Sequence, residues 1–411
     1  MYNNWLKPNK SNKYLFFLIK TLNSFDLKDK RVLLRVDFNV PIVNDRITDN
    51  FRIVSSLPTI KYCLRHGAKI IIMSHLGRPK GNVIPEMSLI SVGEALADLL
   101  EMPIKFSHDC ISEDSHDVTL GLRSGEIHLL ENLRFHIDEE KNNKVFCKKL
   151  AKHGEIYIND AFGTAHRSHG SNSGITSYFL NKGMGLLFEK ELEFLSKKLT
   201  KPKKPLTVIL GGSKTDSKLD LIKNFIVFAD NILIGGGMAF TFLKARGIDI
   251  GKSFIDHSLL DDAKNILSKA RGKVNLFFPK DFLCSKSLKF DDESNIYALN
   301  NIPSNYYGVD IGPDTIKEFS EIISRSKTIL WNGPMGIFEV DGFQNGTEQL
   351  AMNISSETQN DVITIVGGGD SSSAIKNFSL INEFSHVSTG GGASLELLSG
   401  KNLPAIYALE V

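Results

Sequence analysis

Arginine or histidine side chains accompany four apolar runs in the first half of this 411-residue chain. The four segments read VLLRVDFNVP (32–41), KIIIMSHLGRPKG (69–81), IHLLENLRFH (127–136) and EIYINDAFGTAHRSHG (155–170). A run of β-branched and aliphatic residues that stops at Asn, Gly or Pro predicts a buried strand. Ligands of an open parallel sheet bind at the carboxyl ends of its strands, and the guanidinium fork suits phosphate or carboxylate. One such arginine is more often a solvated surface charge, but four at equivalent places predict an anion site.

Glycine-rich loops follow five apolar runs in the second half. These segments read VILGGSKTDSK (208–218), ILIGGGMAF (232–240), ILWNGPMGIFE (329–339), ITIVGGGDSSSA (363–374) and VSTGGGASLELL (387–398). Consecutive glycines between a strand and a helix let backbone N–H groups approach a ligand, and they leave the helix N-terminus facing negative charge. A lone loop of this kind is more often a tight turn. Five together, with Lys214 and Lys218 on the first, predict a nucleotide site, with Ser371 and Ser394 at N-cap positions.

The standard nucleotide fingerprints are missing from these loops. The sequence has no G-x-x-x-x-G-K-[ST], and neither GGGMAF (235–240) nor GGGASL (390–395) completes G-x-G-x-x-G, which disfavours a dinucleotide dehydrogenase. Asp370 directly follows three glycines and is a candidate Mg²⁺ ligand, because Mg²⁺ takes one or two carboxylates plus substrate phosphate oxygens. An N-cap or turn role for the same carboxylate is the simpler interpretation, and the two roles are compatible.

The elements that must position these side chains alternate between strand-like and helical patterns, which predicts parallel α/β architecture. Helical spacing is clear at 55–67 and at 88–100, the second with Ser88 as candidate N-cap. An amphipathic helix followed by a Lys/Pro-rich stretch at 184–205 is typical of a connector between domains. We therefore predict two similar-sized domains, each a parallel sheet flanked by helices, joined by a helical hinge.

Composition and charge argue against nucleic acid and membrane partners. The net charge is +2; residues 1–185 hold 25 Lys+Arg against 20 Asp+Glu, giving +5, and residues 186–411 hold 24 against 27, giving −3. This balance is too weak for the positive field that a nucleic-acid-binding protein needs. No apolar stretch reaches the length of a membrane span. The four cysteines form no C-x-x-C pair, which predicts reduced thiols in a cytoplasmic protein.

The N-terminal segment contains the apolar stretch YLFFLI (14–19) behind three lysines. It is short for a secretion signal, and no small-residue cleavage site follows it. We expect residues 1–18 to form a poorly ordered extension.

Eight blocks of the chain resemble the phosphoglycerate kinase family. They are RVDFNVP (35–41), SHLGRP (74–79), ENLRFH (131–136), DAFGTAHRSHG (160–170), GGSKTDSK (211–218), WNGPMGIFE (331–339), GGGD (367–370) and HVSTGGGASLELL (386–398). The blocks follow the family's order and spacing over about residues 19–411. The resemblance implies reversible phosphoryl transfer between 1,3-bisphosphoglycerate and ADP, giving 3-phosphoglycerate and ATP, with Mg²⁺, in glycolysis. It also implies a monomer that closes its two domains on the substrates.

Residue roles follow from the resemblance, position by position. The phosphoglycerate site would be formed by Asp37, Asn39, Arg52, His75, Arg78, Arg134 and Arg167. Arg78, Arg134 and Arg167 would hold the 3-phosphate. The nucleotide would be held by Lys218, Gly308, Asn332, Glu339, Gly368, Gly369, Asp370 and Ser371, with Asp370 on the metal. The catalytic residues, which act on the phosphoryl group in flight, would be Arg52, Lys214, Gly369 and Gly392.

The predicted domain bounds are 19–185 for the phosphoglycerate domain, with the tail 400–411 packing on it, 186–205 for the connector, and 206–399 for the nucleotide domain. The sequence departs from the family's usual pattern at Asp256, where Glu is common, and in the SSSA loop after Asp370. Neither change removes a group assigned to phosphate or metal. The acceptor carboxylate is already ionised at neutral pH, so we expect positioning and charge neutralisation rather than a general base.

Overall fold

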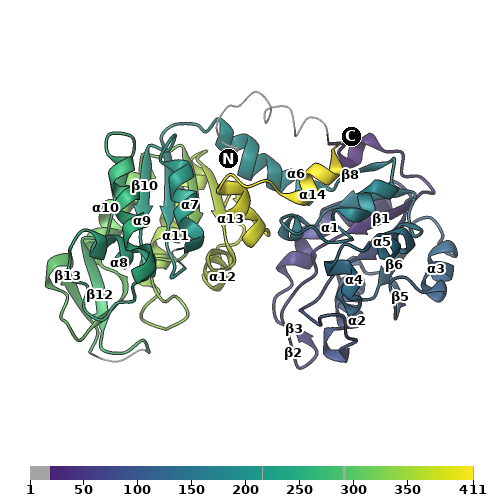
Figure 1. Ribbon diagram of the computed structural model, residues 1–411, viewed down its shortest axis with the longest axis horizontal. Helices are drawn as coiled ribbons and strands as arrows, with labels where there is room; N and C mark the ends of the chain where they lie inside the picture. Colours follow the sequence, from purple (N-terminus) through teal and green to yellow (C-terminus); the bar gives the residue numbers. More distant parts are fainter. Residues whose placement is uncertain (1–18, 215, 290–292, 411) are drawn as a thin grey trace. The chain divides into compact units, whose positions relative to one another are not determined.

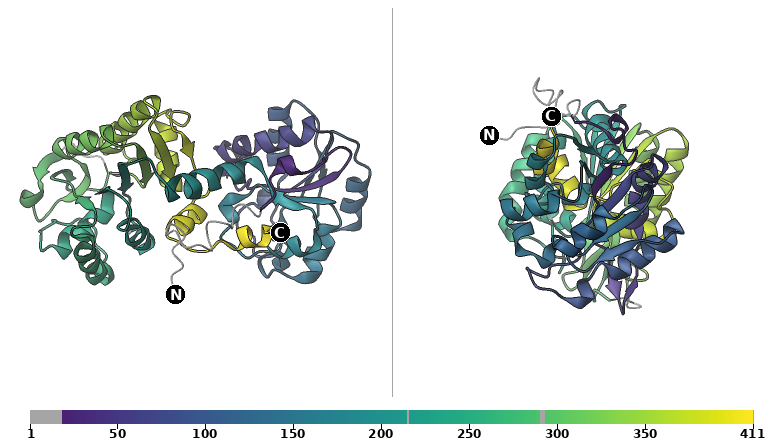
Figure 2. Two further views of the ribbon diagram at one scale, coloured as in Figure 1. Left: turned by 90° about the horizontal axis from the view of Figure 1, so that it is seen from above. Right: turned by 90° about the vertical axis from the view of Figure 1, so that its right-hand side faces the viewer.

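The computed structural model describes residues 19–214, 216–289 and 293–410, so the predicted extension 1–18 lies outside the described residues. The described chain divides into two compact units. One unit, here the N-terminal unit, contains residues 19–193 and 402–410, and the other, the C-terminal unit, contains the described residues of 194–401. Figure 1 shows both units as sheets flanked by helices, and Figure 2 gives two further views.

The N-terminal unit is built on a six-stranded parallel sheet in the order β5-β6-β4-β1-β7-β8. Its strands are β1 (Arg31–Arg35), β4 (Lys69–Met73), β5 (Lys105–Ser107), β6 (Ile127–Leu130), β7 (Ile156–Asn159) and β8 (Lys182–Met184). The central strands are buried along almost their whole length. Near-continuous apolar runs are what a parallel sheet covered on both faces requires, so the predicted strands of the first half are confirmed.

Helices cover this sheet, and a small hairpin extends from it. The helices are α1 (Phe51–Arg65), α2 (Ile90–Leu100), α3 (Glu113–Leu120), α4 (Ile137–Glu140), α5 (Lys144–Ala151), α6 (Leu186–Leu192) and α14 (Pro404–Leu409). Strands β2 (Ile42–Val43) and β3 (Arg46–Ile47) form the hairpin. Helix α14, drawn in yellow, packs beside β8 (Figures 1 and 2), and Lys182 Nζ donates to the Ala408 carbonyl at 2.9 Å. The C-terminal segment is therefore part of the N-terminal unit.

The C-terminal unit has a second six-stranded parallel sheet, in the order β11-β10-β9-β15-β16-β17. Its strands are β9 (Leu206–Leu210), β10 (Asn231–Ile234), β11 (Asn275–Phe277), β15 (Thr328–Asn332), β16 (Ile363–Gly367) and β17 (His386–Val387). Its helices are α7 (Asp216–Phe225), α8 (Gly236–Ala245), α9 (Leu260–Ala270), α10 (Pro313–Ser324), α11 (Asn345–Gln359), α12 (Gly369–Asn377) and α13 (Gly392–Leu398). An antiparallel sheet of β12 (Asp281–Ser285), β13 (Asn295–Ala298) and β14 (Tyr307–Ile311) completes the unit. The predicted fold class, two parallel-sheet α/β domains, is confirmed.

The segment between the two units begins as a helix. The Asp160 carboxylate accepts from the Phe188 backbone N–H at 3.0 Å, which satisfies a donor in the first turn of α6. The helix continues as a π-helical segment, Glu193–Lys198, and the division between the units falls within this segment. The predicted domain bounds, which place a connector at 186–205, stay predictions.

Several predicted helix starts differ from the structure. Helix α1 begins at Phe51 rather than at 55, and the Asp49 carboxylate accepts from the Phe51 N–H at 2.9 Å. Ser88 precedes the N-cap of α2, which is Leu89. The N-caps of α12 and α13 are Gly368 and Gly391, so the N-cap roles predicted for Ser371 and Ser394 are wrong. Among the described residues, no helix combines the length and apolarity needed to span a bilayer.

Candidate active site

Four basic or imidazole side chains meet at the carboxyl edge of the N-terminal sheet. Strands β6, β4, β1 and β7 are neighbours and run parallel, so their carboxyl ends lie along one edge. Arg35 is the last residue of β1, His75 follows β4, Arg134 follows β6, and Arg167 lies in the segment after β7. The fold thus brings together the side chains that the sequence pattern predicted at strand ends.

Arg52 is held at this edge by contacts with the segment after β1. It lies in the first turn of α1, and its Nη1 is 3.3 Å from Asp37 Oδ2 and donates to the Asn39 carbonyl at 2.9 Å. The Arg52 side chain remains 31% exposed. The guanidinium is therefore oriented by two oxygens and still accessible to a ligand.

Arg134 is buried in the short helix Leu133–Phe135, which follows β6. Its Nη1 donates to the Gly77 carbonyl at 2.7 Å, and its Nε lies 3.3 Å from Glu140 Oε1 in an ion pair without hydrogen-bond geometry. Burial and the nearby Arg167 charge lower the pKa of Arg134 to about 10, so it stays protonated at neutral pH. The Arg134 Nε is a buried donor with no hydrogen-bond partner among the described residues, which suits an anionic ligand.

His75 is neutral because it is buried and because it lies among the arginines. Burial lowers its pKa well below the ordinary value, and the charges of Arg35, Arg134, Arg167 and Arg52 lower it further. His169 behaves alike: burial, then Arg134 and Arg167, lower its pKa to about 4. The site therefore concentrates positive charge on guanidinium groups while its imidazoles stay neutral. A multiply charged anion would offset that repulsion.

Asn39, Arg78 and Arg167 complete the set predicted for this edge. The Asn39 Oδ1 accepts from the Gly77 N–H at 2.9 Å and so holds the loop that carries Arg78. Arg78 is exposed and Arg167 is partly exposed. Arg167 Nε is 3.4 Å from His166 Nε2.

Arg35 belongs to the strand-end pattern and to the RVDFNVP block, but the resemblance assigned it no role in the site. It is 1% exposed, its Nε donates to Ser171 Oγ at 2.8 Å, and its Nη2 is 3.3 Å from His75 Nδ1. Ser171 in turn donates to the buried Glu139 carboxylate at 2.6 Å. Arg35 thus fixes His75 from behind. An arginine inside an apolar run is the sequence signal that could have found it, because a buried charge needs partners.

The C-terminal unit brings the glycine loops to the carboxyl edge of its own sheet. Some of these glycines are required for packing between loops: a Cβ on Gly333 would lie 2.2 Å from the Gly211 carbonyl oxygen, and one on Gly236 would lie 2.3 Å from the Gly212 nitrogen. Others face open space, since a Cβ on Gly369 or Gly391 would meet no atom within 4 Å. The open glycines at the starts of α12 and α13 are the ones where a ligand can approach the backbone.

Lys218 lies under the first glycine loop. It is 5% exposed, and its Nζ donates to the Gly211 carbonyl. Burial lowers the pKa of Lys218 to about 8; the Asp370 carboxylate raises it and the Lys214 ammonium lowers it. Lys218 and Asp370 therefore lie close enough to interact, from the start of α7 and the start of α12.

Asn332 and Ser371 connect the neighbouring loops. Asn332 ends β15 and is 2% exposed, and its Nδ2 has no hydrogen-bond partner among the described residues. A Cβ on Gly368 would lie 3.0 Å from this nitrogen, so the amide faces the glycine loop that precedes α12. Ser371 Oγ accepts from the Gly333 N–H at 2.6 Å. An unpartnered buried donor beside a helix N-terminus suits a phosphate oxygen.

Comparison with known proteins agrees with this arrangement. A family model described as phosphoglycerate kinase matches residues 22–401. A phosphoglycerate kinase of Chlorobium phaeobacteroides is 48% identical over 392 residues, which cover 95% of this chain and 99% of the relative. One from Chlorobium chlorochromatii shows the same identity and coverage. The chain belongs to the phosphoglycerate kinase family. As a member of this family, it is a phosphotransferase.

Solved structures of the family share the fold. The phosphoglycerate kinase of Coxiella burnetii is 37% identical with a TM-score of 0.85, over 95% of this chain and 98% of that one. That of Pyrococcus horikoshii OT3 is 31% identical with a TM-score of 0.83 and the same coverage.

The remaining residues assigned from the family resemblance lie in the C-terminal unit. Gly308 lies in β14, where a Cβ would be 2.3 Å from Phe240 Cζ, so close packing alone requires glycine there. Glu339 and Lys214 are exposed on their loops, and Gly392 begins α13. Asp370 is exposed in the first turn of α12. A hard oxygen ligand beside phosphate-binding backbone is what a Mg²⁺–nucleotide requires, so the donors present fit that ion.

Proposed function

We propose that this member of the phosphoglycerate kinase family transfers a phosphoryl group reversibly between 1,3-bisphosphoglycerate and ADP, giving 3-phosphoglycerate and ATP. The observation that carries the proposal is the pair of complementary half-sites. One unit gathers arginines around neutral imidazoles at a sheet edge, and the other gathers open glycine loops, Lys218 and the unpartnered Asn332 amide. The first suits a small multiply charged acid, and the second suits nucleotide phosphates.

In the N-terminal unit, Arg78, Arg134 and Arg167 hold the 3-phosphate. Asp37, Asn39 and His75 orient the rest of the phosphoglycerate. Arg52 contacts the phosphoryl group in flight; its guanidinium is anchored by Asp37 and the Asn39 carbonyl and is still partly exposed. Arginine in this role contributes on the order of 10³–10⁵ in rate in other phosphoryl transferases.

In the C-terminal unit, Lys218, Asn332, Gly368, Gly369 and Ser371 hold the phosphates. Gly308 and Glu339 hold the adenosine. Asp370 would be the protein ligand of Mg²⁺, which supplies charge neutralisation on the phosphate oxygens. Lys214, with the backbone at Gly369 and Gly392, binds the transferring group from the nucleotide side.

No protein group needs to remove a proton in this reaction. The carboxyl group of 3-phosphoglycerate is ionised at neutral pH, since an ordinary carboxyl pKa is about 4. The low pKa values of His75 and His169 agree with this account, because neither imidazole is poised near the working pH. Catalysis then reduces to positioning and charge stabilisation.

We further propose that the two half-sites come together when both substrates bind, with the 186–205 segment as hinge, so that water is excluded. Small-angle scattering should show a smaller radius of gyration with both substrates than with either alone. We also propose a cytoplasmic monomer. All four cysteines are free and buried, which fits a reducing compartment, and one chain carries both half-sites.

Binding measured separately for each substrate tests the assignment of the half-sites. We expect Arg167→Ala to weaken 3-phosphoglycerate about 10- to 100-fold, because a charge-assisted hydrogen bond is lost, while MgADP binding is unchanged. Lys218→Met should weaken MgADP binding and leave 3-phosphoglycerate binding unchanged. Arg65→Ala, at the exposed end of α1, and Lys223→Ala, on the surface of α7, are matched controls that should leave both affinities unchanged. If Arg167→Ala or Lys218→Met lost binding of both ligands while its fold stayed intact, the assignment would be contradicted.

A further inference from the structure

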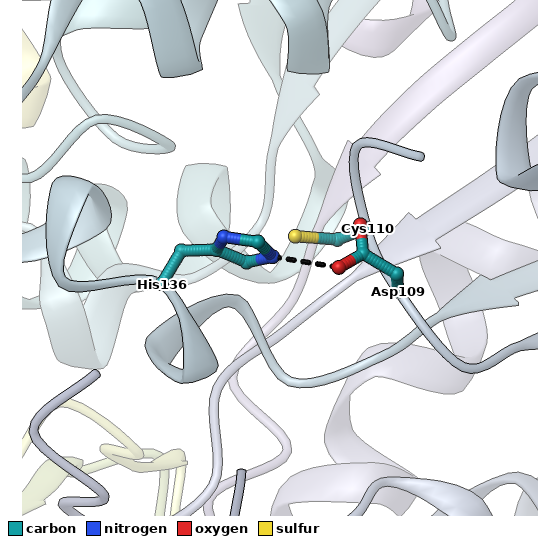
Figure 3. Close-up of side chains that lie close together, drawn as sticks. All are labelled: Asp109, Cys110 and His136. Carbon is teal, nitrogen blue, oxygen red and sulfur yellow. Dashed lines mark hydrogen bonds and ion pairs between the residues drawn. The ribbon is translucent and has the colours of Figure 1, made fainter. Parts of the chain in front are cut away.

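A second cluster of chemically competent side chains lies in the N-terminal unit and is formed by residues to which no role is assigned above. Asp109 and Cys110 lie between β5 and α3, and His136 lies between the short helix Leu133–Phe135 and α4. One ligand atom from each residue lies within 4.8 Å of the others. Figure 3 shows the Cys110 sulfur and the Asp109 carboxylate both facing the same ring nitrogen of His136.

The carboxylate and the imidazole are held in place by the surrounding chain. His136 Nε2 lies 2.9 Å from Asp109 Oδ2, while Oδ1 accepts from the backbone N–H groups of Ile111 and Ser112 at 2.6 and 2.9 Å. The His136 ring packs against Phe146 with centroids 5.6 Å apart. These supporting contacts leave Oδ2 and Nε2 directed at each other, as second-sphere contacts do around metal ligands.

Cys110 is held through its backbone rather than through its side chain. Its carbonyl accepts from His153 Nε2 at 3.1 Å. The thiols of Cys147 and Cys284 donate to Asn142 and to the Phe282 carbonyl, whereas no hydrogen bond from the Cys110 thiol is found among the described residues. Burial, and then the Asp109 charge, raise the pKa of Cys110 well above its ordinary value. A buried neutral thiol of this kind is a poor nucleophile, which disfavours a catalytic-cysteine role.

A metal ion changes the balance of charge in this cluster. A divalent cation deprotonates a coordinating thiol outright, and one thiolate plus one carboxylate cancel its two charges. The sulfur, nitrogen and oxygen set suits a borderline-soft ion, in contrast to the oxygen ligands that Mg²⁺ prefers. Ligand atoms around tetrahedral Zn²⁺ lie about 3.3–3.8 Å apart, so the three side chains need to shift by about 1 Å.

Access to the cluster comes from the side of the carboxylate and the imidazole. The side chains of Asp109 and His136 are 37% and 28% exposed, whereas Cys110 is 1% exposed. An ion can therefore approach from the side of these two more exposed ligands and meet the sulfur on the inner side. Solvent can supply the fourth ligand of a tetrahedral site.

We propose that Asp109, Cys110 and His136 form a binding site for a divalent transition-metal ion of the Zn²⁺ class, with water as fourth ligand. The bound ion ties the loop before α3 to the segment between β6 and α4. The site is independent of the phosphoryl-transfer proposal, since none of its ligands belongs to either half-site. The simpler alternative is a surface Asp–His ion pair beside a core cysteine, and it predicts no metal affinity.

Cobalt titration of the full-length, chelator-treated protein tests the proposal in the absence of substrates. We expect one Co²⁺ per chain, with the near-ultraviolet thiolate-to-metal charge-transfer band and the visible bands of a tetrahedral site. Addition of one equivalent of Zn²⁺ should abolish both. Cys110→Ser should lose the charge-transfer band, and His136→Gln should lower the affinity by more than about 10-fold. Cys147→Ser and Cys284→Ser should behave as wild type.

Thermal unfolding separates a lost site from a lost fold. Wild type should melt at a higher temperature with Zn²⁺ than without it, because an ion that binds only the native state stabilises it by mass action. Cys110→Ser and His136→Gln should melt cooperatively but show no Zn²⁺ effect. Absence of stoichiometric Co²⁺ binding to folded wild type, or a charge-transfer band that survives in Cys110→Ser, would overturn the proposal.

Discussion

Arg52 differs from Arg35 and Arg134 in how it is held. Arg35 and Arg134 are almost completely buried, whereas Arg52 is anchored by Asp37 and the Asn39 carbonyl with a third of its side chain exposed. A guanidinium that is oriented in advance costs little to reorganise when charge develops on a transferring group. Its main effect should therefore be on the transition state rather than on substrate binding.

The corresponding prediction concerns Arg52→Ala. We expect kcat to fall on the order of 10³-fold or more while 3-phosphoglycerate affinity changes by less than about 10-fold. Steady-state kinetics combined with equilibrium binding measures the two quantities separately, with Arg65→Ala on the same helix as control. Near-normal turnover in Arg52→Ala would show that the transferring phosphoryl group does not depend on this side chain.

At this scale the sequence predicted which residues gather but not how each is used. Strand-end arginines could be predicted because a parallel sheet must bring its carboxyl ends to one edge. The position of Arg35 behind His75 could not be predicted, because strands buried on both faces show no alternation and the sequence does not reveal which face a side chain takes. Ser371 was misplaced because Gly368, at φ 92°, starts α12 earlier than a serine N-cap would.

At the scale of elements, the glycines of these loops have two different roles, packing between loops and leaving space for a ligand. Gly333 has φ 100° and its Cβ would overlap the Gly211 carbonyl, whereas Gly369 has open space around it. The sequence predicts the loops but does not distinguish a packing glycine from an open one, because the difference depends on which loops pack against each other. The predicted start of α1 was late for another reason. The Asp49 carboxylate accepts from the Phe51 N–H in the first turn of α1, and the prediction did not use Asp49 as a helix-start signal.

Matched alanine substitutions should separate the two kinds of glycine. Gly333→Ala should destabilise the C-terminal unit by about 3 kcal/mol, because strain and overpacking add. Gly369→Ala should leave stability nearly unchanged and weaken MgADP binding. Denaturant titrations and calorimetric binding measure both effects. Equal stability of the two variants would mean that Gly333 is not required for packing between the loops.

Asp310 connects β14 to α11, and its burial predicts that the stability of the C-terminal unit depends on pH. Its carboxylate, in β14, accepts from the Gly346 N–H in the first turn of α11 at 2.6 Å and from the Ile311 N–H at 2.9 Å. Burial raises the pKa of Asp310 from 3.8 to about 7, against the effect of these two bonds. A folded-state pKa above the unfolded value contributes stability that is present below pH 3.8 and is lost as pH rises to about 7.

Comparison with Asp310→Asn isolates this contribution. Between pH 5 and pH 8 the wild type should lose about 3 kcal/mol of unfolding free energy relative to the variant. Trp331 lies in the same unit and reports its unfolding, in a Trp5→Phe background that leaves it as the one tryptophan. A difference that is constant between the two pH values would mean that Asp310 is not protonated preferentially in the folded state.

At the scale of the whole molecule, the two half-sites lie in units with separate sheets and separate cores. The alternation of strands and helices along the chain allowed both sheets to be predicted from the sequence. The role of the joint could not be derived in the same way, because a helix that continues from one unit into the other carries no pattern that distinguishes a hinge from a rigid connector. In the proposed function, phosphoryl transfer is the property that requires both units.

A coupled assay tests that requirement most directly. The purified protein is incubated with 3-phosphoglycerate and MgATP, and the 1,3-bisphosphoglycerate formed is reduced by excess glyceraldehyde-phosphate dehydrogenase with NADH. We expect NADH oxidation that depends on every component, falls in both Arg52→Ala and Lys214→Ala, and is retained in Arg65→Ala and Lys223→Ala. Absence of activity in folded protein with Mg²⁺, or full activity in Arg52→Ala or Lys214→Ala, would contradict a phosphoryl transfer shared by the two half-sites.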